Sequence, residues 1–186
     1  ASRFQRSPPP STEAVLNAAA RERYGPAGAA AARRAWSAFS QAFQEYPFHA
    51  GVVYHCPVQY GPANLLYPRP TGYRATMTGI PYDDLDAWRG PYPAETFARQ
   101  FAVMARRWAE GIPALKAAVS HAPPSRRAEA SEELRYAQAA EICFRSVANQ
   151  AWFILHRNAL AERGLPEDSR RRRRRAVRSL LQDEIS

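Results

Sequence analysis

The sequence predicts a mainly α-helical protein, an irregular helical bundle with one long ordered loop rich in aromatic residues and proline, and little or no sheet. Apolar side chains recur at spacings of three and four residues before residue 47 and after residue 93, as expected for helices that bury one face. Residues 47–93 hold 8 of the 16 prolines and 6 of the 9 tyrosines. Because disordered linkers are poor in aromatic residues, we expect this loop to be ordered and to face a ligand.

Two helices are expected before the loop, over residues 11–24 and 27–46. Ser11 follows three prolines, so its hydroxyl can cap the first helix, and Gly25-Pro26 is expected to end that helix. Pro47 is expected to end the second helix. Three aromatic residues share one stripe of the second helix: Trp36, Phe39 and Phe43.

Three more helices are expected after the loop. The first begins at Pro93, and Gly111 is expected to end it, with a short segment running from there to a break at Pro123-Pro124. The longest covers residues 125–163, and the last begins near Glu167. Only residues 51–54 and 73–77 hint at strand alternation, and both are short. The apolar faces are Phe97, Phe101, Met104 and Trp108 in the first helix, Leu134, Ala137, Ala140, Phe144, Val147, Ala151 and Ile154 in the second, and Val177, Leu180, Leu181 and Ile185 in the third.

The composition fits one globular domain, since 46% of the residues are hydrophobic and 11% are aromatic. We expect an irregular lead-in over residues 1–10 and a single helical domain over residues 11–186, with residues 47–93 inserted as a loop. The chain does not start with methionine and stops inside an apolar helical repeat, which predicts a fragment of a longer protein. It has no signal-peptide pattern and no apolar run near the roughly 18 to 20 residues that cross a bilayer. These observations predict a soluble protein, cytoplasmic by default, with no membrane partner.

No metal or other cofactor is predicted. Cys56 and Cys143 have no CxxC partner and are expected to be free thiols. The adjacent pair His55-Cys56 is a poor candidate for nucleophilic catalysis, because neighbouring residues do not readily face one another. The acidic run at residues 83–86 lacks the alternation of oxygen ligands that a calcium loop requires.

Basic charge is concentrated in one place. The six consecutive arginines at residues 170–175 account for six of the +9 formal charges. Such a block can bind phosphates, so a basic helical protein that binds nucleic acid is an alternative reading of the chain. We consider a solvated start of the last helix the better interpretation, because no aromatic residues interrupt the block and no nucleic-acid module surrounds it.

The loop carries the candidate binding residues. Carboxylates beside aromatic faces suit a sugar, because the acids accept hydroxyl hydrogens and the rings offer flat apolar surfaces. In this hypothesis the acceptors are Asp83 and Asp84, the stacking faces Trp88 and Tyr82, and the orienting groups Arg74, Asn64 and Gln59. The same acids, with Asp86, could instead cap a short helical turn or pair with Arg74 and Arg89. Tyrosine and arginine would also suit a protein interface.

Several motifs resemble the C-terminal half of large bacterial glycoside-hydrolase-like proteins. They are FSQAF at 39–43, YPF at 46–48, GPANLL at 61–66, TGYRAT at 71–76, PYDDL at 81–85, WRGPYP at 88–93 and FRSVANQ at 144–150. The resemblance implies a preceding β/α barrel, similar to that of hexosaminidase-like glycosidases, on which these helices would pack. The resemblance does not identify a catalytic pair in this chain, because barrel glycosidases place their carboxylates at strand ends and no barrel strands are expected here.

Taken together, the residues and the resemblance predict the C-terminal helical portion of a carbohydrate-active protein. Its loop would contribute to a saccharide site, and the parent would be a glycoside hydrolase, whereas this chain alone would not be catalytic. The expected partners are a saccharide ligand and the preceding barrel domain. A purely structural accessory module remains a further alternative.

Overall fold

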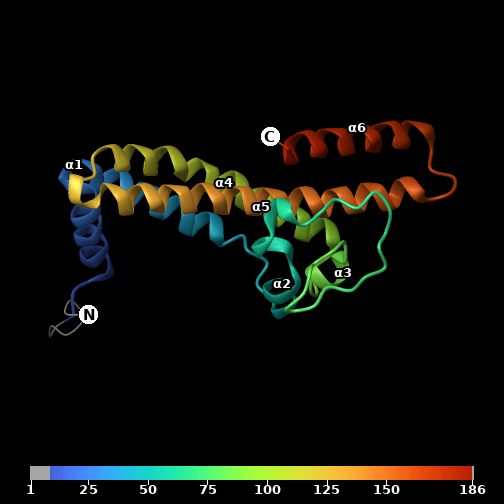
Figure 1. The fold of residues 1–186 in the computed structure, drawn as a ribbon, viewed down its shortest axis with the longest axis horizontal. Coiled ribbons are helices and arrows are strands. Elements are labelled where there is room, and N and C mark those ends of the chain that lie inside the picture. The colour runs from blue at the N-terminus through green and yellow to red at the C-terminus, as the bar shows by residue number, and fades with distance from the viewer. Residues whose placement is uncertain (1–8, 186) are drawn as a thin grey trace. The chain divides into compact units, whose positions relative to one another are not determined.

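A computed structural model describes residues 9–185 of the chain, so most of the expected lead-in over residues 1–10 lies outside the described residues. Within residues 9–185 the fold is built from six α-helices and contains no β-strand (Figure 1). The prediction of a mainly α-helical protein is therefore confirmed. The described residues divide into two compact units, one made of residues 9–43 with residues 107–140, the other of residues 44–106 with residues 141–185.

The first helix, α1 (Thr12–Phe43), joins the two helices expected before the loop. Its start is capped as predicted, since the Ala14 amide donates to the Ser11 hydroxyl at 3.2 Å. Gly25 adopts a left-handed φ of 71°, which interrupts the helix immediately before Pro26. The predicted break therefore exists as a kink within one long element.

Small residues let the helices of the first unit approach closely. An ideal Cβ at Gly28 of α1 would lie 2.9 Å from the Ala118 carbonyl oxygen of α4 (Ala94–Ser120). The Phe39 ring stacks on Trp108, with 4.4 Å between centroids, and the Trp108 indole donates to the Ala137 carbonyl at 2.8 Å. The fully or nearly buried core is Ala20, Tyr24, Ala29, Ala31, Ala32, Ala35, Leu115, Ala118, Ala122, Ala130 and Ala137.

The expected stop at Gly111 is wrong, because α4 continues through Gly111 and Pro113 to Ser120. Gly111 is needed for packing rather than for ending the helix. An ideal Cβ there would lie only 2.5 Å from Cε1 of Phe39. Because Gly111 has no side chain, it leaves room for the Phe39 ring against α4.

The second unit is centred on the first part of α4 and on the second part of α5 (Arg127–Ala161). Most of the predicted apolar face of α5 is buried there. Phe97 and Phe101 of α4 pack on each other, with 5.0 Å between ring centroids. The principal buried residues of these two segments are Phe97, Phe101, Met104, Phe144, Val147, Ala151, Phe153 and Ile154.

The loop is partly helical. It contains α2 (Ala50–His55), the 3₁₀ turns η2 (Pro57–Gln59) and η3 (Gly61–Ala63), and the short α3 (Leu85–Trp88). The hint of a strand at residues 51–54 is wrong, because His49 caps α2 by accepting from the Gly51 amide at 3.0 Å. Residues 73–77 are irregular rather than extended in a sheet.

The last helix, α6 (Glu167–Glu184), lies in the second unit and begins where expected. Another 3₁₀ turn, η4 (Pro124–Arg126), precedes α5. None of the residues of α6 is fully buried. Val177 and Leu180 are half-buried, whereas Leu181 and Ile185 are 40% and 87% exposed, so only part of its predicted apolar seam is covered.

Candidate functional site

The two acids predicted to bind a sugar are engaged within the fold. Asp84 caps α3 by accepting from the Ala87 amide at 3.4 Å, and it also accepts from the Ala75 amide at 3.0 Å. Arg74 lies 3.2 Å from the same carboxylate. Asp83 accepts from Arg157 of α5 at 2.7 Å and from the Thr71 hydroxyl. The alternative reading, in which the acids cap a turn and form ion pairs, is the one these contacts match.

The hydrogen bonds that Asp83 accepts affect its pKa more than its burial does. Burial alone would raise the pKa of this carboxyl, but the bonds from Thr71 and Arg157 together lower it below its ordinary value. Asp83 is therefore an ionised carboxylate in a nearly buried pair, since the two side chains are 9% and 6% exposed. A group held in this way is suited to fixing the loop on α5.

Trp88 does not offer the stacking face expected of it. Its side chain is fully buried, and its indole N–H donates to the Pro81 carbonyl at 3.0 Å. Gln59 is exposed, whereas Asn64 is only 2% exposed. Asn64 donates to the Tyr82 carbonyl and to Gln150 of α5, each at 2.7 Å. Of the predicted set, the residues left with substantial exposure are Gln59, Arg74 and, in part, Tyr82.

Tyr82 belongs to a cluster of three tyrosines. Its ring centroid lies 5.0 Å from that of Tyr73 and 6.4 Å from that of Tyr67. Tyr82 has a left-handed φ of 52°, a conformation uncommon for a bulky residue. Tyr73 is 64% exposed, so this cluster presents an aromatic surface beside the exposed Arg74.

A chain of polar side chains links the loop to α5 and to the end of α6. Gln150 donates to the Gly61 carbonyl and to the Ser146 hydroxyl, each at 2.8 Å. Ser146 in turn donates to Glu184 of α6. Asn149 donates to Glu184 at 2.9 Å and to Asp183 at 2.8 Å.

The acids at the end of α6 are therefore occupied. Arg145 also contacts Asp183, at 3.1 Å from its Oδ1. From α5, Gln150 reaches the loop at the Gly61 carbonyl, whereas Arg145 contacts α6. The two carboxylates at the end of α6 thus contact α5, whereas Glu167, at the start of the helix, lies 3.8 Å from Arg170.

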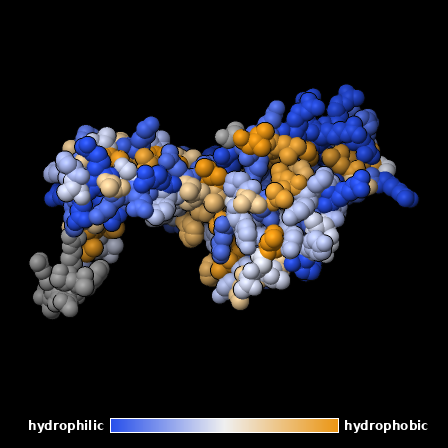
Figure 2. Space-filling model, in the orientation of Figure 1, coloured by the Kyte–Doolittle hydropathy of each residue, from blue (hydrophilic) through white to orange (hydrophobic). Residues whose placement is uncertain are grey.

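One face of α6 carries arginines without acidic partners. Arg171, Arg174, Arg175 and Arg178 follow the i, i+3, i+4, i+7 spacing of a single helical face, and all four are exposed. Among the residues that the structure describes, none of them forms an ion pair. Figure 2 shows hydrophilic residues gathered over the first half of α6. We call these four residues the basic face of α6.

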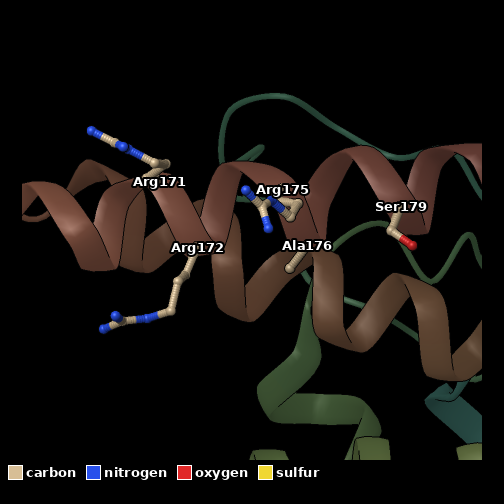
Figure 3. Close-up of a pocket in the computed structure, with 5 residues that line it drawn as sticks. All are labelled: Arg171, Arg172, Arg175, Ala176 and Ser179. Carbon is tan, nitrogen blue, oxygen red and sulfur yellow. The ribbon is translucent and has the colours of Figure 1, made fainter.

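Shallow hollows lie along this helix. One of about 430 Å³ is lined by Arg171, Arg172, Arg175, Ala176 and Ser179, and Figure 3 shows Arg171 and Arg172 extending from the helix in different directions. A second, of about 220 Å³, is lined entirely by arginines 171, 174, 175 and 178. No carboxylate lines either hollow, so both are suited to an anion.

A third hollow, of about 330 Å³, lies between α5 and α6 and is lined by His156, Ser169, Arg172, Arg173 and Ala176. Arg173 Nη1 lies 3.2 Å from Nδ1 of His156, whose ring also stacks on Trp152. Burial first, and then the charge of Arg173, lower the pKa of His156, although Glu95 of α4 acts in the opposite direction. His156 is therefore neutral near pH 7.

The sequence reasoning missed His156 and Arg157. Their partners lie in α6 and in the loop, 17 and 74 residues away in the chain, and no local motif marks these pairs. The four-residue spacing of Trp152 and His156 was the available signal, since it predicts a ring pair on one helical face.

The remaining candidates for chemistry are weaker. Cys56 and Cys143 are free thiols, and burial raises the pKa of each above its ordinary value, which disfavours a reactive thiolate. Across residues 9–185, no group of three or more His, Cys, Asp or Glu side chains is placed to hold a metal ion. In the same part of the chain, no helix has the length and apolar character needed to span a bilayer.

Comparison with known proteins found no family model, no curated protein and no solved structure that matches the chain. The resemblance to glycoside-hydrolase-like proteins therefore rests on the sequence motifs alone. The contacts and charges described above are the basis for the functional proposals.

Proposed function

We propose that this chain binds a nucleic acid through the basic face of α6. The observation that carries the proposal is the set of four exposed arginines on one helical face, none of them ion-paired within the described residues. Arginine suits this role because its planar guanidinium can donate two parallel hydrogen bonds to a phosphate. Phosphates of a polynucleotide would supply the negative charge that no ion pair within the described residues supplies to these four arginines.

The state of α6 favours a nucleic acid over a membrane surface. A helix that lies in a lipid interface needs a free apolar face opposite its charges. In α6 that face is half-buried at Val177 and Leu180. Contacts with α5 also hold the helix at both ends, through Arg170 to the Leu160 carbonyl and through Asp183 to Arg145.

From the sequence, the lack of interleaved aromatic residues favoured a solvated helix start over nucleic-acid binding for the arginine block. The structure adds that the block is helical, that Glu167 before it lies 3.8 Å from Arg170, and that Asp183 and Glu184 at the other end of α6 are engaged with α5. Without interleaved aromatics, base stacking is not expected, so binding should depend on backbone phosphates rather than on sequence.

The test compares two variants with the same loss of charge. In the first, Arg171, Arg174, Arg175 and Arg178 are all changed to Gln. In the matched control, four exposed arginines elsewhere are changed to Gln: Arg21, Arg34, Arg127 and Arg135. Binding to a fluorescent DNA duplex is followed by anisotropy over a range of salt concentrations.

For the unchanged protein, the slope of log K against log salt should be about −3 to −4, because each neutralised phosphate contributes roughly −0.9. The α6 variant should lose most of the affinity and most of this slope, and the control variant should lose little of either. An equal loss in both variants would show that only net charge matters and would contradict the proposal.

A saccharide is the second candidate, favoured by the exposed tyrosine cluster around Tyr82 and by the resemblance noted above. We propose that Tyr73 and Tyr82 would stack on a sugar ring, with Arg74 as an orienting donor. In a longer parent protein, a preceding barrel would then supply the catalytic carboxylates.

This second proposal is tested by titrating the chain with oligosaccharides while following its intrinsic fluorescence. Tyr73→Ala is compared with Tyr136→Ala, because these two tyrosines are similarly exposed, at 64% and 66%. Loss of binding in the Tyr73 variant alone would support the proposal. Binding unchanged in both, or absent from the unchanged protein, would refute it.

A further inference from the structure

The hollow at His156 differs from the basic face of α6 in its shape and chemistry. It is formed by two helices, with His156 contributed by α5 and Ser169, Arg172 and Arg173 contributed by α6. Its volume of about 330 Å³ lies at the lower end of the range typical of small-ligand sites. The four residues of the basic face, Arg171, Arg174, Arg175 and Arg178, do not line it.

The polar groups around this hollow are rich in hydrogen-bond donors. Arg172 already donates to the Ser169 hydroxyl at 3.0 Å, which leaves the hydroxyl hydrogen free to donate onward. Arg173 uses one nitrogen towards His156, so its other N–H groups remain available. None of the residues that line the hollow is acidic, and among the described residues neither Arg172 nor Arg173 forms an ion pair.

The contact between Arg173 and His156 also fixes the tautomer. An arginine guanidinium does not lose its proton, so Arg173 Nη1 must donate and Nδ1 of His156 must accept. The imidazole hydrogen then lies on Nε2. In this state His156 is a neutral donor beside two guanidinium groups, an arrangement suited to a compact anion with several acceptor oxygens.

We propose that this hollow binds a phosphate group in its dianionic form, either as free phosphate or as a phosphomonoester. Two guanidinium charges match the two negative charges of such a group, and Ser169 and His156 supply neutral donors. The inference goes beyond nucleic-acid binding and does not depend on it, because a different set of arginines carries that function.

Binding of a dianion should be coupled to a proton. Two charged groups act on His156 from the elements packed around it, Glu95 from α4 and Arg173 from α6, and Arg172 of α6 lines the same hollow. A bound dianion offsets the repulsion between the arginines and a protonated imidazole. Binding should therefore raise the pKa of His156, and affinity should increase as pH falls through the range in which His156 titrates.

Sulfate is the sharpest first probe, because it stays dianionic over the range in which histidine titrates, whereas phosphate does not. The imidazole signals of His156 in the full chain are followed by NMR as sulfate is added at several pH values. Affinity should rise about threefold to tenfold between about pH 8 and pH 6. The signals of His121, an exposed histidine of the other unit, serve as the internal reference and should not respond.

Three single variants test what Arg173, Arg172 and His156 each contribute to sulfate binding. Arg173→Gln should lose most of the sulfate affinity, and Arg172→Gln, at an exposed position, provides a second test if the first variant does not fold. His156→Gln should retain weak binding but lose its dependence on pH. The Gln variant of the basic face should bind sulfate as the unchanged chain does, so failure of the nucleic-acid proposal and failure of this one are distinguishable.

The source of the phosphate group is resolved by competition. Inorganic phosphate and a short oligonucleotide with a 5′ phosphate should both displace sulfate, whereas the same oligonucleotide with a 5′ hydroxyl should not. Equal displacement by the 5′ hydroxyl and 5′ phosphate forms would assign the hollow to backbone phosphodiesters and overturn the proposal. An unchanged His156 titration in the presence of sulfate, or an equal response in Arg173→Gln, would also overturn it.

Discussion

Three aspartates within four residues have three different environments. Asp83 is held by Arg157 and Thr71, Asp84 is 8% exposed and caps α3, and Asp86 is exposed and pairs with Arg89 at 2.8 Å. Their burial, rather than their shared chemistry, decides how much each contributes. An exposed ion pair contributes little, whereas a buried carboxylate that accepts from backbone amides leaves those donors unsatisfied when it is removed.

We therefore predict that Asp84→Ala lowers the free energy of unfolding by about 1 to 3 kcal/mol, because the amides of Ala75 and Ala87 lose their acceptor. Asp86→Ala is the matched control and should cost less than about 1 kcal/mol. Urea denaturation of the two variants is the measurement. Equal small effects would mean that Asp84 is not needed to hold the loop.

The roles of these aspartates could be predicted in part from the sequence. The capping of a short turn and the pairs with Arg74 and Arg89 were expected as an alternative, because all the partners lie within ten residues. The pairing of Asp83 with Arg157 was not accessible, since it depends on where α5 passes the loop. The burial of Trp88 was missed for a similar reason, because a tryptophan between a turn and a glycine carries no signal of what covers it.

At the scale of elements, the periodic apolar positions predicted the long helices correctly, and the residues expected to start or end a helix were interpreted correctly only where their role is local. Ser11 and Gly25-Pro26 were interpreted correctly, because capping and a left-handed φ are local properties. Gly111 was misread, because its role depends on a ring that α1 brings against α4. A glycine that ends a helix and a glycine that leaves room for a side chain of a neighbouring helix look the same in the sequence. Only the packing distinguishes these two roles.

Gly111→Ala should accordingly destabilise the protein, although alanine normally favours a helix over glycine by about 1 kcal/mol. The new methyl group would meet the Phe39 ring at 2.5 Å, and such overpacking typically costs about 1 to 3 kcal/mol. Adding Phe39→Leu should restore part of the loss. A double-mutant cycle by urea denaturation measures this coupling, and purely additive effects would contradict the steric explanation.

At the scale of the whole molecule, charge is distributed unevenly between the ends of α6. The helix carries six consecutive arginines in its first half, directly after Glu167, Asp168 and Ser169, and it ends with acids that contact α5. The formal charge of +9 increases further when histidines and carboxylates take up protons, so acid both raises repulsion and removes specific contacts. Stability should therefore decline on the acid side of neutrality, and two groups define where.

His156 and Asp83 both have a lowered pKa in the folded chain, and both shifts make stability fall as pH falls. For His156, the unfolded chain takes up a proton below about pH 6.5, before the folded chain does, so stability is lost from there downward. For Asp83 the same loss of stability occurs below about pH 3.9, as the pH falls through the lower pKa of the folded chain.

We predict two steps in the urea midpoint between about pH 8 and pH 2.5, the upper from His156 and the lower from Asp83. His156→Gln should remove the upper step and Asp83→Asn the lower one, whereas His121→Gln and Asp86→Asn should leave both in place. A midpoint that falls smoothly and equally in all of these proteins would assign the loss to general charge repulsion instead.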